Sequence, residues 1–104
     1  MSKSQKKREL PSSHKKFLRA KAHHLKPMVL IGQSGITEGV INSINASLLA
    51  HELIKVRLRE PEDKMKMAEQ IAIQSESHLC GLIGHTIILY RPHPEEPQIQ
   101  LPRL

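Results

Sequence analysis

The segment from Ala22 to Gly39, AHHLKPMVLIGQSGITEG, constrains the fold most, because its structural signals follow one another without a spare residue. Pro27 disfavours helical backbone at the residue before it and closes a preceding helix. The apolar run Met28–Ile31 is short enough for a strand and too apolar for an edge exposed on both faces. Gly32-Gln33-Ser34-Gly35 then turns the chain into a second helix. A loop held between a strand and a helix N-terminus directs backbone N–H groups outward, where they can meet an anion, and two glycines let another backbone come close.

A first helix is expected before the proline, from about Ser12 or Ser13, either of which can cap it, to Leu25. Leu18, Ala22 and Leu25 recur at helical spacing and predict its buried side. The opposite side carries four potential cations at the same spacing, an arrangement that can follow a phosphate backbone. These residues, called the basic ridge below, are Lys16, Arg19, His23 and Lys26. A solvated face without a binding role is the alternative interpretation.

The next two elements are predicted from a change of period. A second helix is expected from Thr37 as the N-cap, with Glu38 in its first turn, to about Ala50. Its buried stripe is Val40, Ile41, Ile44 and Leu48. Between Glu52 and Arg59 the period becomes two, with apolar Ile54, Val56 and Leu58 alternating with Lys55, Arg57 and Arg59. This pattern predicts a strand in a sheet that is covered mainly on one side and is wet and basic on the other.

The remaining elements are a helix and a hairpin. Pro61 is expected in the first turn of a third helix, whose packing face is Met65, Ala68, Ile71 and Ala72. Gly84-His85 reads as a tight turn between the strands Leu79–Ile83 and Thr86–Tyr90. The predicted fold class is therefore α/β (α+β two-layer), in the order αβαβαββ with a four-stranded mixed sheet. We expect a flexible basic arm over residues 1–11, one domain over 12–91 and a proline-rich loose tail over 92–104.

The charge distribution indicates a polyanionic partner. The chain of 104 residues has a formal net charge of +6, and up to Pro27 it holds nine Lys or Arg against the single acid Glu9. Nucleic acid fits this excess, although an acidic protein or an anionic membrane would also accept it. With one Phe, one Tyr and no Trp, the chain lacks the rings with which RNA-recognition sheets stack bases. RNA binding through basic side chains and the glycine loop is the favoured interpretation.

Other classes of function find little support. Cys80 is the only cysteine, which excludes an internal disulfide and a cysteine-based zinc site. His23 and His24 are adjacent and diverge around a helix, so no metal or other cofactor is expected. Ser34 has no identifiable base partner, and Cys80 lies in an apolar run, so we expect no catalysis. No stretch approaches a membrane span, and a cytoplasmic, monomeric protein is expected.

Three segments in order, AHHLKPMVLIGQSGITEGV, HELIKVRL and LIGHTIILYR, resemble the CRM domain and its stand-alone bacterial YhbY family of RNA-binding proteins. The glycine loop is also similar to the backbone-clamping Gly-x-x-Gly of the KH domain. The CRM resemblance covers about Ser12 to Arg91. It implies a fold similar to the C-terminal domain of translation initiation factor three. It also implies binding to ribosomal RNA in precursors of the large ribosomal subunit, as an aid to ribosome assembly.

Carried over by position, the family's RNA-binding surface comprises the basic ridge and the loop residues Gly32, Gln33, Ser34 and Gly35. The family commonly has a lysine after the first glycine of this loop, where this chain has Gln33. A charge-assisted phosphate contact is therefore missing there. His85 and Arg91 match the family's HTIxLYR segment, and a structural role is expected for them first. A module that docks an acidic protein partner remains the alternative function.

Overall fold

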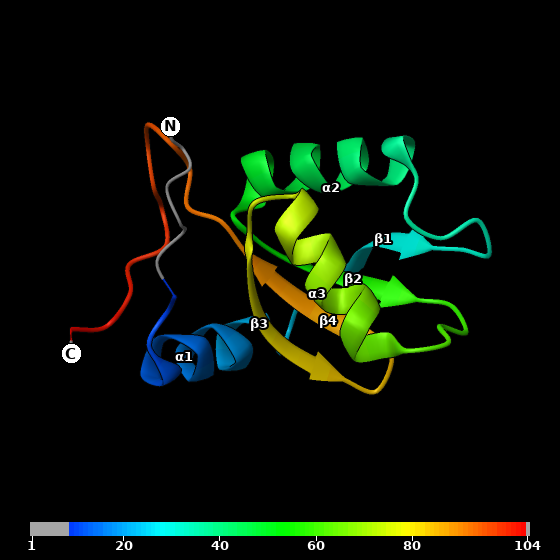
Figure 1. Ribbon diagram of the computed structural model, residues 1–104. Coiled ribbons are helices and arrows are strands. Elements are labelled where there is room, and N and C mark those ends of the chain that lie inside the picture. The colour runs from blue at the N-terminus through cyan, green and yellow to red at the C-terminus, as the bar shows by residue number, and fades with distance from the viewer. Residues whose placement is uncertain (1–8, 104) are drawn as a thin grey trace.

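A computed structural model describes residues 9–103 and shows three helices around a four-stranded sheet (Figure 1). The predicted order αβαβαββ and the mixed sheet are confirmed. The elements are α1 (Ser12–Ala22), β1 (Pro27–Ile31), α2 (Glu38–His51), β2 (Leu53–Leu58), α3 (Lys64–Gln74), β3 (His78–Ile83) and β4 (Thr86–Tyr90). Of the predicted basic arm, residues 1–8 lie outside the described residues.

The strands lie in the order β1-β2-β4-β3. β1 and β2 are parallel, as a strand–helix–strand crossover requires, whereas β4 is antiparallel to both of its neighbours. The turn at Gly84-His85 folds β4 back against β3, so that β4 lies between β3 and β2. β1 is an edge strand: Met28 and Leu30 are 42% and 57% exposed, while Ile31 is buried in the core. The apolar run therefore has one buried and one solvent-exposed side.

The main core lies between the sheet and the pair α2 and α3. The stripe predicted for α2 faces it, with Ile44 and Leu48 fully buried and Val40 and Ile41 partly buried. α3 contributes Ala68, Ile71 and Ala72, as predicted, but Met65 is 48% exposed. Met67 packs against this core in its place. From the strands come Ile31, Ile54, Val56, Leu58, Ile87 and Leu89.

α1 packs on the opposite face of the sheet and adds a partial third layer. Ile88 and Tyr90 alternate along β4 with the core residues Ile87 and Leu89, so they point to the other face, where Leu18 and Ala22 of α1 cover them. α1 covers only part of this face. The basic side of β2 therefore stays partly open, consistent with a sheet covered mainly on one side.

The segment after Arg91 has no helix or strand, but it is anchored, in contrast to the predicted loose tail. The buried Glu52 side chain accepts backbone hydrogen bonds from His93 (2.7 Å), Gln98 (2.9 Å) and Ile99 (3.0 Å). Ile99 and Leu101 pack against the α1 cluster, and the segment runs beside α1 in Figure 1. The sequence around this segment does not indicate the contact, because Glu52 lies 41 to 47 residues earlier in the chain.

The Glu52 carboxyl group is held in its ionised form. Burial alone would raise the pKa of Glu52, but the three backbone N–H donors, together with the positive field of His93, outweigh burial and lower this pKa below 4.5. Glu52 is also the C-cap residue that follows α2, with a φ of 67° in the left-handed region. A strained backbone position and a buried carboxylate thus coincide where the C-terminal segment is fixed.

Two helix boundaries differ from the prediction. α1 ends at Ala22, and neither predicted serine caps it, because Pro11 occupies the N-cap position without a side-chain hydrogen bond. α3 begins only at Lys64, where the Asp63 side chain accepts a hydrogen bond from the Lys66 N–H (3.1 Å). Pro61 lies in the preceding loop rather than in the first turn. The Asp63 cap therefore sets the start of α3, and the proline does not mark its first turn.

Candidate nucleic-acid interface

The basic ridge is exposed along its whole length. Lys16 and Arg19 lie on α1, His23 follows its last residue, and Lys26 lies in the short connection to β1. Although α1 is shorter than predicted, all four side chains remain on the surface. The ridge thus runs from the middle of α1 to the start of β1.

Arg19 is held over the sheet rather than free in solvent. Its Nη1 atom donates a hydrogen bond to the carbonyl oxygen of Cys80 in β3 (2.8 Å). The methylene stem crosses Gly81, where a Cβ atom would lie 2.7 Å from Cδ of Arg19. Gly81 therefore provides the space in which the arginine lies flat on β3. The guanidinium group is fixed at the boundary between α1 and the open part of the sheet.

β2 adds cations that the predicted site did not include. Lys55 and Arg57 alternate with buried Ile54 and Val56, so they point to the same face as α1. The Lys55 Nζ atom donates to the carbonyl oxygens of Leu25 (3.0 Å) and His23 (3.4 Å), just beyond the end of α1. A helix C-terminus carries partial negative charge that repels phosphate, and the Lys55 ammonium group offsets it. The period-two pattern of β2 was the signal for these residues.

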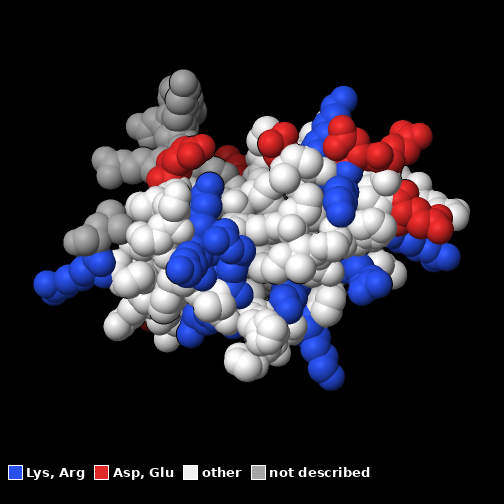
Figure 2. All heavy atoms as spheres, turned by 90° about the horizontal axis from the view of Figure 1, so that it is seen from below, with Lys and Arg blue, Asp and Glu red and all other residues white. Residues whose placement is uncertain are grey.

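Together these residues form one surface, called the basic face below (Figure 2). In this view Lys and Arg side chains lie across the middle of the molecule, whereas Asp and Glu lie mainly at its margins. Between α1 and the open part of the sheet the face is hollowed by about 330 Å³. The basic face consists of Lys16, Arg19, His23, Lys26, Lys55 and Arg57.

The loop between β1 and α2 is a tight turn. The Gly35 N–H donates to the Gly32 carbonyl oxygen (3.1 Å), and Gly35 has a φ of 74° in the left-handed region that favours glycine. The N–H of Gly35 is therefore used within the loop and does not point to a ligand. A Cβ atom on Gly32 would meet no other atom within 4 Å, so the backbone there is open to approach. Thr37 caps α2 as predicted, accepting from the Val40 N–H (3.1 Å).

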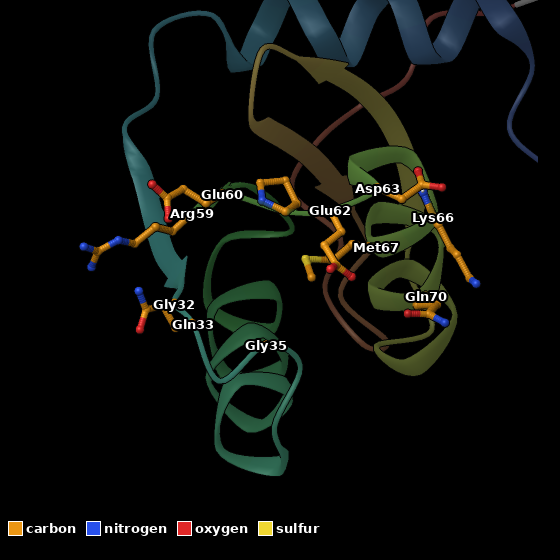
Figure 3. A pocket seen from close by; sticks show the side chains of 11 residues that line it. Gly32, Gln33, Gly35, Arg59, Glu60, Glu62, Asp63, Lys66, Met67 and Gln70 are labelled. Atoms are coloured by element: carbon orange, nitrogen blue, oxygen red, sulfur yellow. The ribbon is translucent and has the colours of Figure 1, made fainter.

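The loop does not touch the basic ridge. β1 separates them, since it starts after Lys26 and ends at the loop. Arg59 connects the two parts: its N–H donates to the Ile31 carbonyl oxygen (3.0 Å), directly before the loop. In Figure 3 the side chains of Arg59 and Gln33 both project to the side away from α3. A cation thus lies near the loop at Arg59, the residue that follows β2.

On its other side the loop borders a hollow of about 630 Å³ whose far wall is the start of α3 (Figure 3). Glu60, Glu62 and Asp63 line this hollow together with Arg59 and Lys66. Figure 3 shows the Glu60 side chain beside that of Arg59, and the Lys66 side chain on α3, so acidic and basic side chains are mixed around this hollow.

The two residues singled out near the end of the domain have structural contacts. The Arg91 guanidinium group donates to the Asn45 side-chain oxygen (3.0 Å), the Ser75 carbonyl oxygen (2.6 Å) and the Asn45 carbonyl oxygen (3.3 Å). It therefore joins α2 to the end of α3. His85 is exposed in the hairpin turn, where its carbonyl oxygen accepts from the Leu58 N–H (2.7 Å).

Within residues 9–103, no cluster of three or more His, Cys, Asp or Glu side chains is arranged to hold a metal ion. Nor is any helix in this range both long and apolar enough to cross a membrane. Cys80 is buried.

Comparison with known proteins shows which family the chain resembles. The model of the CRS1 / YhbY (CRM) domain matches residues 10–91. "Probable RNA-binding protein YqeI" of Bacillus subtilis is 43% identical over 95 residues, which cover 89% of this chain and 99% of the relative. An "RNA-binding protein" of Haemophilus influenzae is 43% identical over 96 residues, covering 90% of this chain and 96% of the relative.

A solved structure shows the same fold. The solution structure of the hypothetical protein SAV1595 from Staphylococcus aureus superposes with a TM-score of 0.78 at 37% identity, covering 89% of this chain and 99% of that protein. The family match spans every helix and strand described above. The chain therefore belongs to the CRS1/YhbY (CRM) domain family.

Proposed function

We propose that this protein binds RNA through its basic face and the adjoining Gly32–Gly35 loop, without a catalytic step. The observation that carries this proposal is the convergence of cations from α1, from the connection to β1 and from β2 on one face of the molecule. Like charges are gathered in this way at a cost in self-repulsion, which a polyanion relieves on binding. The relatives named as RNA-binding proteins support RNA as that polyanion.

The phosphate backbone would lie along the basic face and reach the loop on the Arg59 side. Each phosphate that is neutralised releases condensed counterions and adds to the salt dependence of binding. The open backbone at Gly32 lets an RNA strand approach without a side chain in its path.

The RNA that we propose is ribosomal RNA in precursors of the large ribosomal subunit, in the cytoplasm, with the protein acting as a monomer that assists assembly. This part rests on the resemblance to the YhbY family. It is tested by sedimentation of tagged protein in a sucrose gradient of cell extract, with and without ribonuclease. Migration with large-subunit precursors that is lost after ribonuclease treatment is expected. Migration only as free protein would contradict the ribosomal assignment.

The alternative, docking of an acidic protein, would use the same cations. The two functions are separated by competition, because an RNA-binding face discriminates between polyanions by the nature and spacing of their negative charges. A short ribosomal RNA hairpin should displace labelled RNA at far lower concentration than an unstructured acidic polypeptide of equal charge. Equal displacement by both would favour the alternative.

A further inference from the structure

The basic face combines cations with exposed aliphatic side chains in and beside its hollow. Strand pairing aligns Leu30 with Arg57, Arg57 with Thr86, and Thr86 with Ile83, so these four side chains form one row across all four strands. Leu30 and Ile83 are 57% and 62% exposed, although a phosphate contact needs neither. A surface that bound phosphates alone would have no use for this apolar area.

The next row forms the floor of the hollow and α1 forms its wall. Lys55 pairs with Ile88, and Ile88 pairs with Gly81. Arg19 lies over Gly81 and is hydrogen-bonded to the Cys80 carbonyl oxygen, so one guanidinium group is fixed at the rim before a ligand arrives. The lining consists of Arg19, His23, Pro27, Lys55, Arg57, Ile83, Thr86 and Ile88.

The volume of the hollow and the chemistry of its lining residues together indicate which ligand it can bind. The volume of about 330 Å³ is near the lower end for small-molecule sites. It matches a single nucleotide, whereas a double helix is far too wide to enter. Bases that are free of a duplex lie against flat or apolar surfaces and stack on arginine guanidinium planes. This chain has almost no aromatic rings, so Arg57 and the exposed Ile83 are the groups that can serve this purpose here.

We propose that this hollow binds one unpaired nucleotide, with its base against Arg57 and Ile83 and its phosphate at Arg19 and His23. The inference rests on the proposed RNA binding and adds that the protein selects RNA with a bulged or otherwise unpaired residue. The basic ridge would contact the phosphates of the flanking duplex, and the hollow would bind the unpaired nucleotide that interrupts it.

The test compares two RNA hairpins of equal length and charge, one with a two-nucleotide bulge and the other with those nucleotides in an extra base pair. Affinities are measured by fluorescence anisotropy with the full-length protein at fixed salt. Stacking of one base predicts that the bulged hairpin binds about tenfold more tightly. Arg57→Lys keeps the charge but loses the planar face, and Ile83→Ser removes apolar surface. Each variant should lower the ratio of the affinity for the bulged hairpin to the affinity for the paired hairpin by about threefold or more.

Ile73→Ser is the matched control, because Ile73 is 73% exposed on α3 and should leave the ratio unchanged. Equal affinity of wild-type protein for the two hairpins, with strong salt dependence, would overturn the nucleotide site and leave the proposed RNA binding intact. The same holds if the Arg57 and Ile83 variants weaken both hairpins equally. Failure to bind either hairpin would overturn both proposals.

Discussion

Glu52 is the residue whose replacement should reveal most about how this small domain is held together. Its two carboxylate oxygens accept three backbone N–H groups, one on Oε2 from His93 and two on Oε1 from Gln98 and Ile99. In Glu52→Gln, one of these oxygens becomes an NH₂ group. The glutamine side chain fits best with its oxygen at the Oε1 position, where the two hydrogen bonds are kept. Its NH₂ group then faces the His93 N–H, so that two donors meet and that bond is lost.

The expected cost follows from these contacts. A hydrogen bond to a charged group contributes about 1.5–3 kcal/mol, and the two retained bonds weaken when the charge is lost. We therefore expect Glu52→Gln to lower the free energy of unfolding by about 3 kcal/mol, a large share of the roughly 5–15 kcal/mol typical of a domain. The midpoint of thermal unfolding should fall by roughly 10–20 °C. Glu76→Gln is the control, since Glu76 is an exposed acid, and it should change stability by less than about 0.5 kcal/mol.

The effect should depend on pH with a definite sign. The pKa of Glu52 is lowered in the folded state, so the unfolded chain takes up the proton first as pH falls below about 4.5. The stabilisation is therefore complete above that pH and is lost as pH drops through the folded-state pKa. Urea unfolding followed by circular dichroism at pH 7 and in steps down to about pH 3 measures it. The reasoning is refuted if wild type and Glu52→Gln unfold with equal free energy at pH 7, or if their difference stays constant on acidification.

Three further predictions concern the interface. Gln33→Lys should tighten RNA binding and steepen its salt dependence by roughly one counterion, measured by anisotropy across a salt series; an unchanged slope would place position 33 outside the contact. Gly32→Asp should weaken RNA binding. Its free energy of unfolding should stay within about 0.5 kcal/mol of the wild-type value, because a Cβ atom at this position has open space. Normal RNA binding by this variant would mean that the loop is only a turn and not part of the interface. Arg19→Ala should flatten the salt slope by roughly one counterion and also cost about 1 kcal/mol of stability, through loss of the bond to Cys80. Loss of stability without a change in slope would make Arg19 purely structural.

The sequence predicted the elements whose signals are local. Periodicity identified all seven elements, and the buried stripe of α2 and the alternation of β2 were predicted residue by residue. Boundaries were less certain where two local signals competed, as at Asp63 and Pro61. Met65 was placed in the core because it has helical spacing to Ala68, but Met67 fits better when α3 packs on the sheet.

Contacts between distant segments could not be predicted from the sequence. Nothing near Glu52 indicates that it will anchor residues 93–99, because the pairing depends on how α2 ends beside the C-terminal segment. For the same reason Lys55 and Arg57 were recognised as an exposed basic side of a strand but not as part of the site. Only the placement of α1 on that face of the sheet brings them next to Arg19 and His23.

The most direct test of the basic face is the salt dependence of RNA affinity in variants that lack cations on one face of the sheet or on the other, compared per cation removed. The double variant Lys16→Ala with Arg57→Ala removes one cation from α1 and one from β2, whereas Lys64→Ala removes an exposed cation from α3 on the other face of the sheet. The slope of log affinity against log salt should fall by roughly 1.5–2 for the double variant and stay unchanged for Lys64→Ala. Similar loss per cation in both variants, or no measurable RNA affinity in wild-type protein, would contradict the assignment of this face as the RNA-binding surface.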